Sequence, residues 1–300
     1  MRIHAVIRYI GMVLQFIAAF MLLSAVVSLL NDHDSAFYPL LLSSFLTALL
    51  GLFPLIFVEK AGDIKIKEGY AIVVGSWLLA CIVGMFPYLI WGGEFTMINA
   101  WFESVSGYTA TGATILNNIE YLPQGLLFYR TSSNWLGGVG VVMFALVILP
   151  SLGTSKMSLS NVELSSLAKD NYRYRTQIII RILLIVYVGL TIATTLALKF
   201  AGLRWFDALN HAMSACATAG FSTKNASIAF YDNVAVEFIL AGAMLISSLH
   251  FGLIYATFIR KGNNVFRSEV VKTYFTIIVV ATLLVATSIF GANVYTSIWE

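Results

Sequence analysis

The chain alternates between long apolar runs and short polar breaks. Seven of the runs are long enough to cross a membrane as helices, because a spanning helix needs about 20 mostly apolar residues. These runs cover residues 5–30, 37–58, 70–91, 121–152, 178–203, 234–259 and 274–290. Two further apolar segments, residues 94–106 and 205–215, reach only half of that length. The pattern predicts an all-α polytopic membrane protein with two half-length helices among its spans.

Composition excludes a soluble protein. Only 11% of the residues are charged and 59% are hydrophobic, whereas a soluble domain carries roughly 25% charged residues. In a membrane protein the positions of the positive residues matter more than the net charge of +3, and we expect membrane lipid rather than nucleic acid as a partner. The two cysteines, Cys81 and Cys216, lie in apolar surroundings and indicate neither a disulfide framework nor a metal site.

The positive residues orient the chain in the membrane. If the N-terminus is cytoplasmic and both half-length segments enter and leave on the outer side, all but four of the 18 Lys and Arg residues lie on the inner side. Cytoplasmic loops carry an excess of Lys and Arg, so this topology is favoured. It makes the half-length segments re-entrant, and irregular backbone at membrane depth survives only inside protein or along a water-filled path.

The two half-length segments end in polar turns that align with each other. The stretch ESVSGYTATG, from Glu103 to Gly112, aligns with HAMSACATAG, from His211 to Gly220, and Ser106 matches Ser214. We call this pairing of positions the repeat alignment. The surrounding order also repeats: span, half-helix, small polar turn, span, basic connector. Because both copies have the same orientation, we predict parallel repeats about an axis along the membrane normal.

A half-helix followed by a turn of small residues is typical of a pore. Such helices direct partial charge at a central cavity, and rings of backbone carbonyls replace the hydration shell of an ion. Residues 109–112 and 217–220 carry only small side chains, and their glycines allow unusual dihedral angles. Neither segment contains a carboxylate, which argues against a filter for divalent cations.

Longer motifs around these turns resemble those of a known family. SVSGYTATGAT, SSNWLGGVGVVMFALVILP and HAMSACATAGFSTKNAS are similar to motifs of the bacterial TrkH/KtrB potassium-uptake family, and the leading pair of helices is more similar to TrkH than to KtrB. The resemblance implies a K+-translocating subunit of the bacterial inner membrane, with four M1–pore helix–M2 units in one chain. It also implies a homodimer that binds a cytoplasmic nucleotide-binding regulator of the RCK type, with K+ as the transported ion and no organic cofactor.

The resemblance assigns two segments of a selectivity filter. They are Thr109, Ala110, Thr111 and Gly112, followed by Ala217, Thr218, Ala219 and Gly220. Glycine at both filter positions implies K+, since related plant transporters with serine at the first of these positions prefer Na+. Ala110 and Ala219 depart from the threonine and glycine that the family often has, which leaves the detailed selectivity open.

Matched to the family's pattern, the chain divides into four parts. We expect a leading pair of helices (1–60), a first pore unit (61–153), a second pore unit (154–262) and the first helix of a third (263–300). Only two of four filter segments are then present, so we expect a fragment or a truncated product. The alternative is that two chains each contribute two filter segments.

Three charged residues lie near the two turns. Arg130 lies about nine residues into its apolar run, where a charge in lipid is costly. It either supports the filter through a pair with Glu103 or Asp207, or snorkels to the outer interface. Both carboxylates either attract cations at the pore mouth or serve the pore helices, and the early position of Asp207 in its half-helix suits the helix dipole.

Some remaining motifs have two interpretations. Gly137-Gly138-Val139-Gly140 superficially resembles a phosphate loop, but it follows no strand, so close packing of helices is favoured. The connectors at residues 156–175 and 260–272 form a basic cytoplasmic face, which either contacts lipid headgroups or docks the regulator.

Two other classes of function compete with ion conduction. An intramembrane enzyme needs a nucleophile–base pair or paired acids within the spans, and the only candidates are serines beside His250, with no acid on that run. We therefore expect no catalytic residue and no enzyme. A cation-coupled secondary transporter would bind its solute between broken helices, and the parallel repeat argues against it. His250 is either a neutral, hydrogen-bonded side chain or a proton-coupling site.

Overall fold

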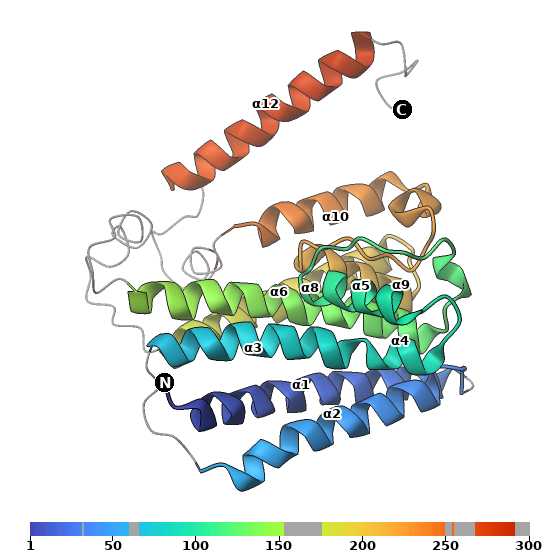
Figure 1. Ribbon diagram of the computed structural model, residues 1–300. Coiled ribbons are helices and arrows are strands. Elements are labelled where there is room, and N and C mark those ends of the chain that lie inside the picture. Colours follow the sequence, from blue (N-terminus) through green and yellow to red (C-terminus); the bar gives the residue numbers. More distant parts are fainter. Residues whose placement is uncertain (32, 60–65, 153–175, 250–253, 255–267, 292–300) are drawn as a thin grey trace. The chain divides into compact units, whose positions relative to one another are not determined.

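The computed structural model describes residues 1–31, 33–59, 66–152, 176–249, 254 and 268–291. Every regular element in these residues is a helix, as the pattern of apolar runs predicts (Figure 1). The chain forms two units, Met1–Ser248 and Leu249–Glu300. The first unit contains both half-length helices and both polar turns. The second contains α12 (Glu269–Gly291).

The first two helices, α1 (Ile3–Leu30) and α2 (Phe37–Phe57), pack against each other along their length. A Cβ placed on Gly51 would lie 2.8 Å from the carbonyl oxygen of Gly11, so the two backbones approach closely. The Ser44 hydroxyl donates a hydrogen bond to the Ala18 carbonyl at 2.8 Å. Small residues and hydrogen bonds between helices are how helices associate in lipid.

The next two groups of helices repeat one arrangement. The elements are α3 (Ile66–Gly84), α4 (Phe86–Trp91), α5 (Met97–Tyr108), the 3-10 helix η1 (Ile119–Tyr121) and α6 (Gln124–Leu152), then α8 (Thr176–Phe200), α9 (Trp205–Cys216), the 3-10 helix η2 (Ser227–Tyr231) and α10 (Val234–Ser247). The short helix α5 packs against α3 and α6, and the short helix α9 packs against α8 and α10. Helix α6 also contacts α8 and α9 and so joins the two groups (Figure 1). Both groups have the predicted order of long helix, half-helix, turn and helix, although the last helix of the second group, α10, has only 14 residues.

Five helices are long and apolar enough to cross a membrane among the residues that the structure describes. They are Ile3–Leu30, Phe37–Phe57, Lys67–Trp91, Arg181–Phe200 and Glu269–Ile289. Helices α5 and α9 have 12 residues each and are too short, as predicted. His250 and the connector at residues 156–175 lie outside the described residues, as does most of the connector at residues 260–272.

The third apolar run is long enough to span the membrane, as predicted for residues 70–91, and the structure has this span at Lys67–Trp91, interrupted by one turn that was not predicted. It breaks at Met85 into α3 and α4. Pro87, in the first turn of α4, has no backbone N–H and its ring clashes with a carbonyl of the preceding turn, which kinks a helix. The Tyr129 hydroxyl donates a hydrogen bond to the Gly84 carbonyl at this break, at 2.9 Å.

The sixth run also differs from the prediction. We expected one span over residues 234–259, but α10 ends at Ser247 after 14 residues. The hydroxyls of Ser247 and Ser248 donate hydrogen bonds to carbonyls four residues earlier, at 2.7 Å and 2.9 Å. Such bonds compete with the backbone ladder and destabilise or bend helices. A hydropathy profile does not detect these hydrogen bonds and so does not predict the early end of α10.

Candidate functional site

The first polar turn begins where α5 ends at Tyr108. The backbone N–H of Ala110 donates a hydrogen bond to the Gly107 carbonyl at 2.9 Å. The N–H of Thr111 reaches back to the Ser106 carbonyl, also at 2.9 Å. These two bonds form a Schellman cap, which satisfies the last carbonyls of a helix and turns the chain sharply away.

The second polar turn has the same cap at the end of α9. The N–H of Thr218 donates to the Ala215 carbonyl at 3.1 Å, and the N–H of Ala219 donates to the Ser214 carbonyl at 3.0 Å. The repeat alignment matches each of these donors and acceptors with its counterpart in the first turn. The alignment found in the sequence therefore describes a repeat of backbone structure.

Both caps place a residue other than glycine in the left-handed region. The φ angle is 53° at Ala110 and 50° at Thr218. This region costs an L-residue roughly 1–2 kcal/mol, and a β-branched residue such as threonine is especially rare there. Strain of this kind persists only where the surrounding structure determines the conformation, and it is concentrated at functional sites.

Replacing Thr218 with glycine is expected to raise the free energy of unfolding by about 1 kcal/mol, because glycine adopts this conformation without strain. The matched variant is Ala217→Gly, whose φ of −76° needs no glycine. It is expected to lower stability by about 0.5–1 kcal/mol. Thermal unfolding in detergent measures both. Equal destabilisation by the two substitutions would contradict the assignment of strain to Thr218.

The two turns meet at their glycines. A Cβ placed on Gly112 would lie 2.4 Å from the backbone nitrogen of Gly220, and the φ of Gly112 is +76°. Both observations exclude a side chain at position 112. A Cβ on Gly220 would lie 3.5 Å from the Cα of Gly112, which is an ordinary contact. The structure therefore brings together the ends of the two segments that the sequence assigns to a filter.

The side chains of the first turn are hydrogen-bonded locally. The Thr109 hydroxyl donates to the Val105 carbonyl and lies 2.7 Å from the Thr111 hydroxyl. The backbone carbonyls of residues 109–112 and 217–220, in contrast, accept no hydrogen bond from any residue that the structure describes. Four of these residues, Thr109, Thr111, Thr218 and Gly220, are exposed, so their carbonyl oxygens are open to water or to a cation, and the two segments approach each other at Gly112 and Gly220.

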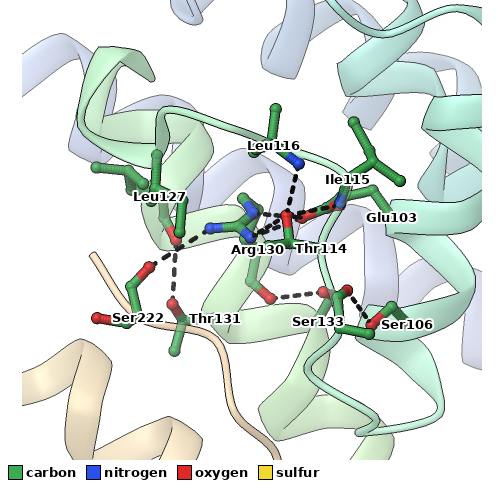
Figure 2. A network of polar contacts seen from close by, with 12 residues as sticks. Glu103, Ser106, Thr114, Ile115, Leu116, Leu127, Arg130, Thr131, Ser133 and Ser222 are labelled. Atoms are coloured by element: carbon green, nitrogen blue, oxygen red, sulfur yellow. Dashed lines mark hydrogen bonds and ion pairs between the residues drawn. The ribbon is translucent and has the colours of Figure 1, made fainter. Parts of the chain in front are cut away.

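Behind the first turn lies a buried ion pair between α5 and α6. Nη2 of Arg130 lies 2.6 Å from Oε1 of Glu103, and Nε of Arg130 donates to the same oxygen at 2.8 Å. The side chains are 1% and 0% exposed. The Thr114 hydroxyl donates to both oxygens of the Glu103 carboxylate, at 2.9 Å and 3.1 Å. Figure 2 shows this network, in which Arg130 pairs with Glu103 and points into the protein.

Arg130 also contacts the chain that follows the second polar turn. Its Cζ atom lies 4.1 Å from the centroid of the Phe221 ring, and Nη1 lies 3.5 Å from the Ser222 carbonyl oxygen (Figure 2). Phe221 directly follows Gly220, the last residue of the second polar turn. A guanidinium over an aromatic face is attractive, and more so when both are buried. Arg130 therefore contacts residues that follow each of the two polar turns: Thr114 after the first, and Phe221 and Ser222 after the second.

The second group of helices, α8 to α10, has a related arrangement. Nε2 of His211 lies 3.0 Å from the Ser222 hydroxyl. His211 and Ser222 match Glu103 and Thr114 in the repeat alignment. In each group of helices, a side chain of the half-helix thus binds the hydroxyl of a residue in the chain that follows the turn. His211 lies within the repeat alignment opposite Glu103, and extending the alignment past the glycines pairs Thr114 with Ser222; none of these three residues was predicted as a site residue.

Asp207, the other predicted carboxylate, does not contact Arg130. Its Oδ1 atom accepts a hydrogen bond from the Thr223 hydroxyl at 2.7 Å, and its backbone carbonyl lies 2.8 Å from Nδ1 of His211. Asp207 is buried in the first turn of α9. A carboxylate in this position also interacts favourably with the helix dipole.

The glycines of residues 137–140 pack helices, as predicted. A Cβ on Gly137 would lie 2.4 Å from the carbonyl oxygen of Tyr108, and a Cβ on Gly138 would lie 3.0 Å from the Cα of Ala217. Helix α6 thus approaches the C-terminal ends of both half-helices through adjacent glycines. Close contact of this kind requires residues without side chains.

Comparisons with known proteins agree with this geometry. The family model TrkH, described as a cation transport protein, matches residues 41–296. The chain is 37% identical to the Trk system potassium uptake protein TrkH of Escherichia coli K12 over 246 residues, which are 80% of this chain and 50% of that protein. It is 41% identical to the protein of the same name from Salmonella typhimurium over 197 residues, which are 65% of this chain and 41% of that protein.

A solved structure is similar over nearly the whole chain. The crystal structure of the potassium transporter TrkH from Vibrio parahaemolyticus matches with a TM-score of 0.85 and 30% sequence identity, covering 99% of this chain and 61% of that chain. The chain spans about half the length of the curated relatives that it matches. On the match to the family model and the identity to these relatives, the chain belongs to the TrkH family of cation transport proteins.

Proposed function

We propose that this chain contributes to potassium uptake across the bacterial inner membrane. In this proposal K+ passes over the backbone carbonyls of residues 109–112 and 217–220. The observation that carries it is the pairing of two equivalent turns at Gly112 and Gly220, with carbonyls that accept no hydrogen bond from the described residues. The names of the Escherichia coli and Vibrio relatives, a potassium uptake protein and a potassium transporter, support the choice of ion.

The physical basis is replacement of the ion's hydration shell. Carbonyl dipoles can substitute for water around K+ without any charged side chain. Both half-helices end at their turns, so the partial negative charge of each C-terminus lies beside the proposed path. Small residues in the turns leave the backbone accessible to the ion. Glycine at positions 112 and 220 underlies the proposed preference for K+ over Na+.

We assign positioning roles to the polar residues behind the turns. The pair of Glu103 and Arg130 holds Thr114, and with it the chain that leaves the first filter segment. In the second unit, Asp207 binds Thr223 and has the equivalent role. Such contacts fix the carbonyls before an ion arrives, so that less reorganisation is needed when it binds.

The wider organisation follows from the same proposal. The leading helices (1–60) precede two pore units (61–153 and 154–262), which each supply one of the four filter segments, and residues 263–300 form the first helix of a third unit. The assembly is a homodimer with a cytoplasmic N-terminus, and a cytoplasmic nucleotide-binding regulator of the RCK type binds it. The basic connectors suit that contact, since they carry the positive charge expected on the cytoplasmic side.

Uptake of rubidium, a K+ analogue, tests this function. Two proteins are expressed in a bacterium that lacks K+ uptake: this chain, and a chimera in which it replaces the matching part of Escherichia coli TrkH. We expect the chimera to take up Rb+, with inhibition by excess K+ but not by excess Na+. We expect no uptake by the chain alone, because a ring of carbonyls needs the remaining segments.

Membrane content of each protein is measured on the same cells. A chimera that reaches the membrane yet takes up no Rb+, or whose uptake Na+ blocks as well as K+ does, would contradict the proposed function. Uptake by the chain alone would contradict the assignment of two of four filter segments and favour two chains that share them.

A further inference from the structure

The outer loops of the two pore units are joined by hydrogen bonds that converge on Asn225. Its side-chain oxygen accepts a hydrogen bond from the backbone N–H of Ile119 at 2.6 Å. Its side-chain nitrogen donates to Oδ1 of Asn118 at 3.0 Å. Its backbone N–H donates to Oε1 of Glu120 at 3.2 Å. Both the amide oxygen and the amide nitrogen of this residue of the second pore unit thus form hydrogen bonds with the first pore unit.

A charge contact lies beside this amide. Nζ of Lys224 is 3.9 Å from Oε2 of Glu120 and 4.3 Å from the centroid of the Phe230 ring. The two side chains are 20% and 38% exposed, and ion pairs open to solvent contribute little and have loose geometry. The hydrogen bonds of Asn225 also lie at the surface, but they are directional. The directional contact between the two loops is therefore the side chain of Asn225, which has one donor and one acceptor engaged with neighbouring residues.

These loops are the continuation of the two filter segments. Asn118 follows Gly112 by six residues, and Asn225 follows Gly220 by five. The segments already touch at their glycines. A second connection in the loops fixes their separation at another point. A shift of either loop would therefore move the carbonyls that precede it.

We propose that Asn225 is a positioning residue that braces the outer mouth of the pathway and sets the spacing of the two filter segments. This role rests on the proposed ion path. It concerns how tightly the ion is held rather than whether the chain folds. The ligand of the braced segments is a dehydrated monovalent cation, and the brace acts on it through the backbone.

The repeat supplies a matched control. Asn117 matches Asn225 in the repeat alignment and is the same residue type. It is exposed and makes no hydrogen bond with any residue that the structure describes. Among these described residues, the contact is therefore made by Asn225 of the second pore unit alone, and its counterpart Asn117 in the first unit makes no equivalent contact. Asn117→Ala removes an equal side chain without removing the brace.

A double-mutant cycle on this chain tests the contact without reference to transport. We expect Asn225→Ala to lower the melting temperature in detergent by about 2–4 °C, since two hydrogen bonds are lost. Asn118→Ala is expected to have a smaller effect, and the double variant to lose no more than Asn225→Ala alone. Asn118→Asp keeps the acceptor oxygen and should match the parent, as should Asn117→Ala. Additive effects, or an equal loss from Asn117→Ala, would overturn the brace.

Rubidium uptake by the chimera tests the positioning role. Asn225→Ala is expected to raise the half-saturating Rb+ concentration about three- to tenfold, with a maximal rate per membrane protein within about twofold of the parent. Asn225→Asp keeps the acceptor for Ile119 but not the donor, so it should restore part of the loss. A lower melting temperature with unchanged half-saturation would overturn the positioning role and leave only a loop contact. If the parent chimera takes up no Rb+, the proposed function fails, while the melting cycle still decides whether the brace exists.

Discussion

Replacing Arg130 with methionine is expected to lower the free energy of unfolding by about 3–5 kcal/mol. The substitution leaves the Glu103 carboxylate without its cation at a site that is 0% exposed. An unpaired buried charge is far more costly than a missing ion pair. The contact with Phe221 is lost as well. Thermal unfolding in detergent should show a larger loss than for any other single substitution proposed for this chain, and the chimera carrying it should take up no Rb+.

The control for this prediction removes both charges. The double variant Arg130→Met with Glu103→Gln leaves no unpaired ion, so it is expected to recover at least half of the lost stability. Arg130→Lys keeps the charge but not the planar fork that reaches Glu103 and Thr114 together, and it should fall between the parent and Arg130→Met. If the double variant is less stable than Arg130→Met, the loss does not come from an uncompensated Glu103.

Gly112→Ala is expected to have the second largest effect. The new Cβ would lie 2.4 Å from the Gly220 nitrogen, and alanine would have to adopt a φ of +76°. Overpacking against backbone and a left-handed conformation each cost about 1–3 kcal/mol. Relief requires the two turns to separate, which displaces the carbonyls beside them. We therefore expect lower stability together with loss of Rb+ uptake by the chimera.

Gly220→Ala is the matched comparison for this substitution. Its Cβ would meet the Cα of Gly112 at 3.5 Å, and Gly220 is not among the described glycines with positive φ. This substitution should lower the free energy of unfolding by less than about 1 kcal/mol. Because Gly220 lies in the proposed filter, Rb+ uptake by the chimera with this substitution is measured separately. Equal destabilisation by Gly112→Ala and Gly220→Ala would show that the two glycines do not meet as the structure describes.

The architecture was predictable because its signals are local. A run of about 20 apolar residues is readable without tertiary information, and the runs that became α1, α2, α8 and α12 illustrate this. The break at Met85 was missed although Pro87 is visible in the sequence, because a high hydropathy over the whole run outweighed one residue. The early end of α10 was missed because serine hydroxyls are weak signals in a sequence and act through bonds within the helix.

The candidate site was predictable only in part. The repeat alignment identified both turns, and the structure shows the same cap in each. Residues that support the turns were harder to find, because Thr114 and Ser222 are ordinary polar residues in a sequence. Their importance depends on which side chain they meet. Asn225 illustrates this, since its partners Asn118 and Glu120 follow the other polar turn, more than 100 residues away in the chain.

The sequence by itself determined the all-α membrane architecture, the repeat and the position of its two polar turns. These properties depend on hydrophobicity and on spacing along the chain. An apolar run in lipid forms a helix because the helix satisfies every backbone hydrogen bond within the run. Only the tertiary structure decided that Arg130 pairs with Glu103, on another helix, and also reaches Ser222, which follows the second polar turn. It alone decided that Gly112 and Gly220 touch. Such contacts join segments that a hydrophobic pattern does not distinguish from one another. They depend on how the helices pack, and the order of residues within one helix does not reveal that packing.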